Sequence, residues 1–247
     1  MKKIGILDSG IGGFSILKDL IDSNLDAEYF YISDNDNVPY GEKTQDFIIN
    51  RLRLMVKSLI GKSVDAIIIA CNTATVETIN QLRAEFDIKF VGIEPYINYL
   101  NHSESKRLAL ILTNSTFKSK RFSYLKQTHD PEGKVEIYPL KSLALIIERL
   151  LTNTFESIRA DVDSELDKID FTKYDNLILG CTHYPLIKNY IETKYNIKTI
   201  DPNKSVIKHL CKELSLKEGP HNDIFAIDLN IQDRWIQSNI KDFKIFF

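Results

Sequence analysis

Two cysteines stand in matching sequence contexts. Cys71 follows the apolar run 65–70 and Cys181 follows the similar run 175–180, and small or polar residues come after each of them. A free thiol has a pKa of about 8.5, and a helix N-terminus lowers it, so we expect both thiols to be partly ionised at neutral pH. Thiols in matching contexts suggest a duplicated architecture that brings one reactive group from each half of the chain to a shared cleft. The pair therefore indicates a reaction that needs two opposed groups.

Other uses of cysteine fit less well. A phosphatase-type loop needs an arginine shortly after the cysteine, and neither Cys71 nor Cys181 has one. A zinc site from both thiols and His183 lacks the Cys-x₂₋₄-Cys spacing of structural zinc sites, so no metal is expected. Free cysteine is also a common core residue, which remains the alternative for the pair. Cys211 belongs to the apolar stripe of a predicted helix around 206–214, and we interpret it as core.

Short β-rich runs alternate with stretches of helical period, which is typical of βα units on a mostly parallel sheet. One predicted helix contains Ile48, Leu52, Met55 and Leu59 at spacings of three to four residues. The strands predicted in the first part of the chain are 3–7, 28–33, 66–70 and 89–93, and the helices are 14–21, 44–60 and 73–86. Cys71 would then follow the carboxyl end of a strand, where parallel α/β proteins bind their ligands.

A second series repeats this order. Its predicted strands are 107–112, 135–138, 176–179 and 198–200, and its helices are 119–128, 142–151, 155–169 and 184–193. The run 3–9 also resembles 107–115, at nearly the offset that separates the two cysteines. We therefore predict an α/β fold of two similar lobes with parallel sheets, although such runs also recur by chance.

The predicted boundary between the lobes follows Ile93-Glu94-Pro95, where the sequence turns polar. The stretch from about Ser205 is too short for a lobe of its own and is expected to pack on the first. The predicted division is residues 1–97 plus 206–247 for the first lobe and 98–205 for the second.

Composition excludes several classes of protein. The 247 residues suffice for one large domain or two lobes. A formal net charge of −2 argues against nucleic acid as the main partner. Three cysteines without a Cys-x-x-Cys motif favour a reducing compartment over a disulfide framework. No apolar run approaches the roughly 20 residues of a membrane span, and the N-terminus is too polar for a signal peptide. We expect a cytoplasmic protein that does not bind membranes.

Two further segments follow predicted strands. Asp8-Ser9-Gly10-Ile11-Gly12-Gly13 joins a carboxylate and a hydroxyl to a glycine-rich turn, in which Ser9 is expected to cap the helix starting near Phe14. Its glycines do not form the dinucleotide fingerprint G-x-G-x-x-G. The second segment, from Asp34 to Gly41, has the composition of a turn. Alone, neither segment defines a function.

Together, these segments resemble the signature sequences of the glutamate racemases, within the aspartate/glutamate racemase family. The matching segments, in the family's order and spacing, are Asp8-Ser9-Gly10, Pro39-Tyr40-Gly41, Ala70-Cys71-Asn72-Thr73-Ala74, Gly92-Ile93-Glu94-Pro95 and Gly180-Cys181-Thr182-His183-Tyr184-Pro185-Leu186. The resemblance spans nearly the whole chain. It implies two flavodoxin-like lobes with the active site between them, no cofactor, and interconversion of L- and D-glutamate, which supplies D-glutamate for peptidoglycan.

The resemblance also implies roles for individual residues. Cys71 would take the Cα proton from D-glutamate and Cys181 from L-glutamate, with Asp8 assisting the first thiol and His183 the second. Substrate binding would fall to Asp8, Ser9, Tyr40, Gly41, Asn72, Thr73, Thr182 and His183, with Thr113, Asn114 and Thr116, at the end of a predicted strand, as plausible additions. This chain has Leu112-Thr113 where the family usually has Gly-Thr. It also lacks the proline that the family often has within 143–148, so a role for Glu148 near the second thiol is only suggested.

Two alternatives to this function stay open. One is racemisation of aspartate or another amino acid by the same chemistry. The other is a protein that keeps the fold but acts by binding a partner, as an inhibitor of DNA gyrase does. The resemblance further implies a homodimer. Because the chain starts at its first predicted strand, the N-terminal extension of precursor-activated family members is not expected.

Overall fold

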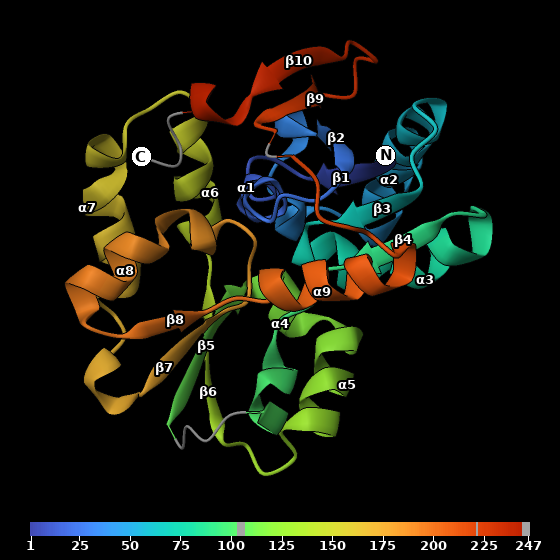
Figure 1. Cartoon of the computed structure of the whole chain (residues 1–247). Coiled ribbons are helices and arrows are strands. Elements are labelled where there is room, and N and C mark those ends of the chain that lie inside the picture. The colour runs from blue at the N-terminus through green and yellow to red at the C-terminus, as the bar shows by residue number, and fades with distance from the viewer. Residues whose placement is uncertain (103–106, 221, 244–247) are drawn as a thin grey trace.

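The computed structural model describes residues 1–102, 107–220 and 222–243, and it contains two separate sheets with helices on their faces (Figure 1). The first sheet has the strand order β10-β9-β2-β1-β3-β4. All its neighbouring strands run parallel except β10, which is antiparallel to β9. Its members are β1 (Lys2–Asp8), β2 (Ala27–Ser33), β3 (Ala66–Ile69), β4 (Lys89–Gly92), β9 (Ile224–Leu229) and β10 (Ile236–Asn239).

The second sheet has the order β6-β5-β7-β8, and all of its strands are parallel. Its members are β5 (Leu108–Thr113), β6 (Val135–Leu140), β7 (Asn176–Leu179) and β8 (Lys198–Ile200). Numbered within each half of the chain, the first four strands of both sheets have the same spatial order, 2-1-3-4. The predicted α/β fold of two similar lobes with parallel sheets is confirmed.

Helices follow most strands, as the sequence pattern requires. They are α1 (Phe14–Asp22), α2 (Gln45–Gly61), α3 (Asn72–Glu85), α4 (Asn114–Lys118), α5 (Lys120–His129), α6 (Leu143–Glu148), α7 (Phe155–Leu166), α8 (Lys188–Tyr195) and α9 (Asn203–Leu214). In α2 the apolar residues at helical spacing are buried in one cluster with β3. Its first turn is capped by Thr44, whose Oγ1 accepts a hydrogen bond from the Phe47 N–H at 3.3 Å.

The helices of the second lobe differ from the prediction in several places. The predicted helix 184–193 begins as a 3₁₀ turn, Tyr184–Ile187, and becomes α-helical only in α8. Pro185 lies in that turn, where its missing N–H leaves no unmade helical hydrogen bond. The predicted helix 142–151 is α6 followed by a second 3₁₀ turn, Arg149–Leu151. The short helix α4 was not predicted from periodicity, because five residues are too few to show one.

The C-terminal part of the chain adds β9 to the edge of the first sheet beside β2 and then β10 beside β9 (Figure 1). The sequence analysis did not predict these two strands. Trp235 packs edge-on against Phe30 of β2, with 5.8 Å between ring centroids. The helix α9 contacts α1 and β4. The division into 1–97 plus 206–247 and 98–205 stays a prediction, and it includes residues outside those described.

The largest hydrophobic cluster takes buried side chains from both lobes, among them Ile11 and Phe14 next to β1 and Ile147 and Tyr184 of the second lobe. The two lobes therefore share one core along part of their boundary. Cys211 is only partly buried and packs against this cluster.

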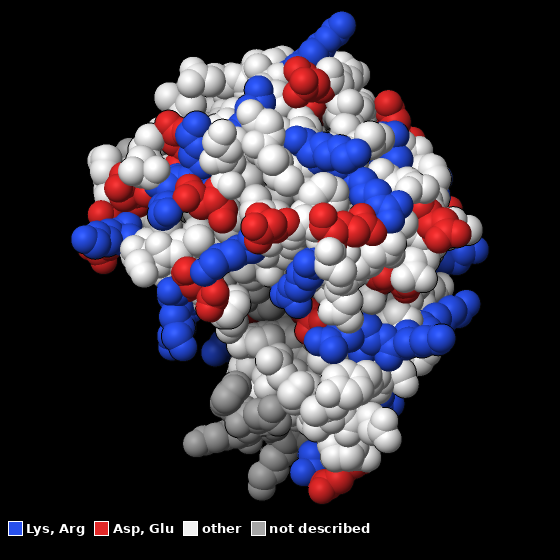
Figure 2. Space-filling model, turned by 90° about the vertical axis from the view of Figure 1, so that its right-hand side faces the viewer, with Lys and Arg blue, Asp and Glu red and all other residues white. Residues whose placement is uncertain are grey.

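Within the described residues, no helix combines the length and the apolar character that crossing a membrane requires. Over the face shown in Figure 2, Lys and Arg side chains are interspersed with Asp and Glu. This mixture agrees with the small net charge of −2.

Candidate active site

Loops that follow strands of both sheets line one cavity of about 190 Å³. Cys71 directly follows the buried strand β3 and its carboxyl-side residue Ala70, and Cys181 follows β7 in the equivalent place of the second lobe. Most of the residues that the sequence analysis selected line this cavity: Ser9, Tyr40, Gly41, Cys71, Asn72, Thr73, Thr113, Asn114, Cys181, Thr182 and His183. The duplicated fold thus brings the two thiols to a common site.

Cys71 is the N-cap residue of α3, as expected from its position. Its Sγ lies 3.6 Å from the Ser9 Oγ. Burial raises the pKa of the Cys71 thiol to about 12, and the negative charge of Asp8 acts in the same direction. The expectation of a partly ionised thiol is therefore wrong for Cys71, because desolvation outweighs the helix N-terminus.

Asp8 lies behind Ser9, fully buried and outside the cavity lining. Its Oδ1 accepts a hydrogen bond from the Gly10 N–H at 2.8 Å, and its Oδ2 accepts one from the Thr182 hydroxyl at 3.3 Å. Burial raises the pKa of Asp8 to about 6, although His183 partly offsets this effect. Ser9 does not cap α1, whose N-cap is Gly13 without a side-chain hydrogen bond, and this detail of the prediction is wrong.

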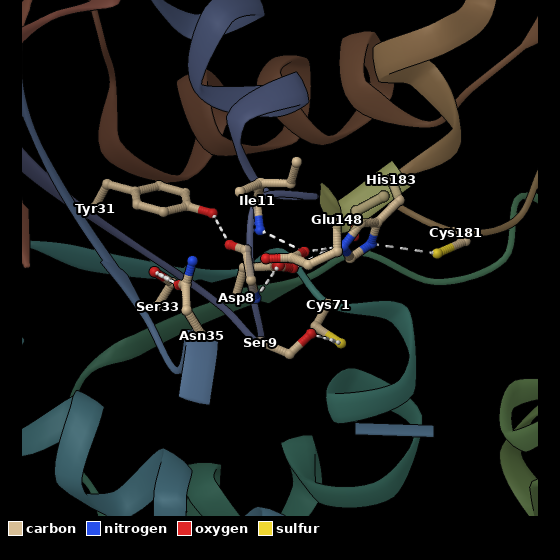
Figure 3. A network of polar contacts seen from close by, with 12 residues as sticks. Asp8, Ser9, Ile11, Tyr31, Ser33, Asn35, Cys71, Glu148, Cys181 and His183 are labelled. Atoms are coloured by element: carbon tan, nitrogen blue, oxygen red, sulfur yellow. Dashed lines mark hydrogen bonds and ion pairs between the residues drawn. The ribbon is translucent and has the colours of Figure 1, made fainter. Parts of the chain in front are cut away.

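Beside the second thiol lies a buried histidine–carboxylate pair (Figure 3). The Cys181 Sγ is 3.7 Å from the His183 Nδ1, and the His183 Nε2 is 2.7 Å from the Glu148 Oε2. That same carboxylate oxygen accepts a hydrogen bond from the Ile11 N–H at 3.0 Å. Burial alone would lower the pKa of His183, but its hydrogen bonds to Cys181 and Glu148 raise it well above the ordinary value. His183 can therefore hold a proton next to Cys181.

The glycine-rich turn after β1 lets the two lobes approach closely. A Cβ added at Gly10 would lie 2.3 Å from the Glu148 Oε2. A Cβ added at Gly12 would lie 2.6 Å from both the His183 Nδ1 and the Thr182 Oγ1. These glycines are required by the side chains of the second lobe, which occupy the space that a larger residue would need.

Three threonines join the lobes on another side of the cavity. The Thr73 Oγ1 lies 3.3 Å from the Thr113 Oγ1 and 3.2 Å from the Thr116 Oγ1. Thr113 also donates to Thr116 at 3.0 Å. Thr116 is fully buried and does not line the cavity, so it supports the other two hydroxyl groups from behind.

Asn72 is the clearest unsatisfied group in the cavity wall. Its side chain is buried, and neither its Oδ1 nor its Nδ2 has a hydrogen-bond partner among the described residues. Leaving a buried amide unpaired costs about 1–3 kcal/mol. A polar ligand in the cavity would satisfy both atoms.

Comparison with known proteins identifies the family. The model of the Asp/Glu/Hydantoin racemase family matches residues 21–210. The chain belongs to this racemase family. A glutamate racemase of Campylobacter concisus is 34% identical to it over 220 residues, which cover 87% of this chain and 84% of the relative.

Solved structures agree with this assignment. The glutamate racemase of Francisella tularensis, solved with D-glutamate, has a TM-score of 0.69 and 28% identity, covering 87% of this chain and 81% of its own. The Escherichia coli glutamate racemase, solved with L-glutamate and an activator, has a TM-score of 0.77 at 23% identity, covering 92% and 88%, and shows the shared fold.

Some residues of the racemase cavity were not selected from the sequence. Lys141 follows β6 and lines the cavity together with Glu42, Ser115, Ala144 and Leu145. Lys141 directly follows a strand, just as Asp8 and Cys71 directly follow predicted strands. The same criterion could therefore have selected Lys141 from the sequence. Glu148 is the last residue of α6 and lies outside the signature segments, so only the family resemblance suggested it.

A larger hollow of about 510 Å³ lies between α5 and α9, lined in part by Glu94, Arg121 and His209. It contains neither thiol, so its size does not make it the reaction site of the racemase. Among the described residues, no group of three or more His, Cys, Asp or Glu side chains is placed to hold a metal ion.

Proposed function

We propose that this racemase interconverts L- and D-glutamate by proton transfer between two thiols, one on each side of Cα. The observation that carries the proposal is the placement of Cys71 and Cys181 at equivalent points of the two lobes and in the wall of one cavity. Several curated glutamate racemases are 34% identical to the chain over most of its length, which supports glutamate as the substrate.

In the direction from L to D, the Cys181 thiolate takes the Cα proton, and the electron pair of the C–H bond stays on Cα. The Cys71 thiol then donates its proton to the opposite face. Burial keeps Cys71 protonated at neutral pH, because its pKa is about 12, which suits the acid of this step. The reaction leaves the two thiols in exchanged protonation states, from which the reverse reaction starts.

His183 is proposed to receive the thiol proton of Cys181, since its Nδ1 lies 3.7 Å from the Sγ. Glu148 accepts the hydrogen bond of the other ring nitrogen and stabilises the resulting imidazolium. Asp8 acts on the other side, where its charge would keep the Cys71 proton in place. Asp8 would therefore favour the protonated form of Cys71, whereas Glu148, by stabilising the protonated His183, would favour removal of the proton from Cys181.

Substrate binding is proposed for Ser9, Tyr40, Gly41, Asn72, Thr73, Thr113, Asn114 and Thr182. The start of α3 presents N–H groups and a positive partial charge, which suits a carboxylate. The unpaired amide of Asn72 offers both a donor and an acceptor to the substrate. Thr116 would act through Thr73 and Thr113, with which it forms hydrogen bonds.

The proposed physiological role is the supply of D-glutamate for peptidoglycan, as in the glutamate racemases that the chain resembles. A cytoplasmic location is proposed because the three cysteines are free thiols, which are typical of a reducing compartment. A homodimer is proposed from the family resemblance.

The deciding experiment is proton NMR of the purified protein with L-glutamate in deuterated water, together with chiral analysis and a parallel sample of L-aspartate. We expect loss of the Cα proton signal and appearance of D-glutamate. Cys71→Ala and Cys181→Ala should each abolish racemisation. Turnover of aspartate alone would overturn the substrate, and full activity of either variant would overturn the two-thiol mechanism. Inhibition of gyrase supercoiling by the double variant would support the binding-protein alternative.

A further inference from the structure

The loop from Asp34 to Glu42 carries Tyr40 and Gly41 to the cavity, and it is organised around one buried carboxylate. Asp34 directly follows β2 and is fully buried. Arg51 of α2 donates two hydrogen bonds to it, from Nε to Oδ2 at 2.7 Å and from Nη2 to Oδ1 at 2.6 Å. This is the bidentate geometry in which an arginine–carboxylate pair is strongest.

Two groups of the loop itself bind the same carboxylate. The Asn37 Nδ2 donates to the Asp34 Oδ1 at 2.9 Å, and the Tyr40 hydroxyl donates to the Asp34 Oδ2 at 2.8 Å. Each oxygen of Asp34 therefore accepts one hydrogen bond from Arg51 and one from the loop. The carboxylate joins α2 to the segment that lines the cavity.

This arrangement changes the role expected for Tyr40. Its ring lines the cavity and is almost completely buried. A phenol has a single proton to donate, and Tyr40 donates it to Asp34. The hydroxyl proton is therefore used to hold the loop, so Tyr40 can contribute to substrate binding only as an acceptor or through the position of its ring and of the adjoining Gly41 backbone.

Apart from this carboxylate, the loop is held by a hydrogen bond from the Asp36 N–H to the Asn230 Oδ1 at 2.9 Å, and it has little regular structure. Its regular parts are two 3₁₀ turns of three residues each, Asn35–Asn37 and Tyr40–Glu42. The second turn packs against α4 of the other lobe, where a Cβ at Gly41 would lie 3.5 Å from the Ser115 Cβ. A shift of the loop would therefore alter both the cavity wall and the contact between the lobes.

We propose that Arg51 and Asp34 are positioning residues of the racemase, which hold the Tyr40–Glu42 turn in the geometry that receives the substrate. Neither residue lines the cavity, so both act through Tyr40 and Gly41. The inference rests on the proposed function, because it names residues that prepare that same site. The Arg51–Asp34 salt bridge thereby has a role in substrate binding in addition to stabilising the fold.

The chain offers a matched control on the same helix. Arg53, two residues further along α2, also forms a bidentate pair, with the Glu85 of α3 at 2.7 and 2.6 Å. Neither Arg53 nor Glu85 lines the cavity. Comparing Arg51→Gln with Arg53→Gln separates the positioning of the loop from the general loss of an arginine–carboxylate pair.

Two readouts are needed, namely steady-state kinetics with glutamate and hydrogen exchange of the amides in 34–43. Arg51→Gln should lower kcat/KM at least tenfold, mainly through KM, because small misplacements of binding groups cost on the order of 100-fold in rate. Its loop amides should exchange faster than in the wild type. Arg53→Gln should leave both measurements unchanged. Tyr40→Phe combined with Arg51→Gln should lose no more than the larger single loss, because both act through Asp34.

Equal effects of Arg51→Gln and Arg53→Gln on both readouts would overturn the inference. If Arg51→Gln does not fold, Arg51→Lys decides, since lysine keeps the charge but loses the two-pronged geometry. Wild-type values for Arg51→Lys in KM and loop exchange would also overturn it. If the wild type does not racemise glutamate, the proposed function fails, while the exchange comparison still tests whether Arg51 holds the loop.

Discussion

The buried carboxyl group of Asp8 lowers the stability of the folded protein at neutral pH. This group is fully buried, and its pKa is raised from the ordinary value of 3.8 to about 6. Well below pH 3.8 the group is neutral in both the folded and unfolded states. As the pH rises from about 4 to about 6, the unfolded chain loses this proton while the folded protein keeps it, so this residue lowers the stability of the folded protein, and the full effect is present above pH 6.

Asp8→Asn should therefore stabilise the protein at pH 8 by about 1–3 kcal/mol, since one pKa unit corresponds to about 1.4 kcal/mol. Urea denaturation at several pH values tests this, and the advantage should shrink as the pH falls from 6 and vanish well below the ordinary pKa of 3.8. Racemisation should fall in the same variant, because the charge beside Cys71 is lost.

Asp65→Asn provides a control of opposite sign. The hydrogen bond from Lys2 lowers the pKa of Asp65, so its stabilising effect is present at neutral pH and is lost as the pH falls. An Asp8→Asn variant that is less stable than the wild type at pH 8 would contradict the argument.

Lys141 is a lysine in the cavity wall, exposed and without a carboxylate partner among the described residues. A substrate with two carboxylates would gain from this charge. We expect Lys141→Gln to raise KM for glutamate roughly three- to tenfold with little change in kcat, because surface charge interactions are worth about 1 kcal/mol.

The effect should shrink at high salt, where exposed charges are screened. Lys118→Gln, on α4 but outside the cavity lining, is the control and should leave KM unchanged. A loss of kcat without a change in KM would show that Lys141 does not act on substrate binding.

At the scale of elements, the turn between β1 and α1 determines how closely the lobes approach. Gly10→Ala would place a Cβ 2.3 Å from the Glu148 carboxylate, and this contact displaces Glu148 from His183. We expect kcat/KM to fall about 100-fold, by the same argument from misplaced catalytic groups.

Gly61→Ala, at the end of α2, has open space around its added Cβ and should keep full activity with equal or slightly higher stability. The two variants can be compared by steady-state racemisation and thermal unfolding. Full activity of Gly10→Ala would show that the Glu148 position is not needed.

For the whole molecule, the shared core predicts that the two lobes unfold together. The largest hydrophobic cluster contains side chains of both lobes, so opening one exposes apolar surface of the other. The single tryptophan, Trp235, packs against β2 and reports on the first lobe, whereas far-UV circular dichroism reports on both.

Denaturation curves from tryptophan fluorescence and circular dichroism should therefore coincide within error. Transitions at clearly different denaturant concentrations would show that the lobes unfold separately. Trp235→Phe should keep the circular dichroism transition within about 1 kcal/mol, which would confirm that the probe does not govern it.

The sequence by itself determined the architecture and the two thiols. Buried parallel strands are nearly continuous apolar runs, and the residues after them are small or polar, so both features can be read locally. Cys71 and Cys181 were selected in this way, as was Asp8. The strand β9 has an apolar run as long as those that were predicted, so it could have been found, whereas β10 has no buried residue and only one apolar residue among its four.

Only the tertiary structure decided how the groups act on one another. The pKa of Cys71 depends on desolvation by side chains of both lobes, which no local pattern contains. Glu148 meets His183 and Ile11, and Arg51 meets Asp34, across long stretches of sequence. Local sequence reports which residue types follow a strand, whereas distances between separate segments, and therefore burial and charge, are fixed only when the chain has packed.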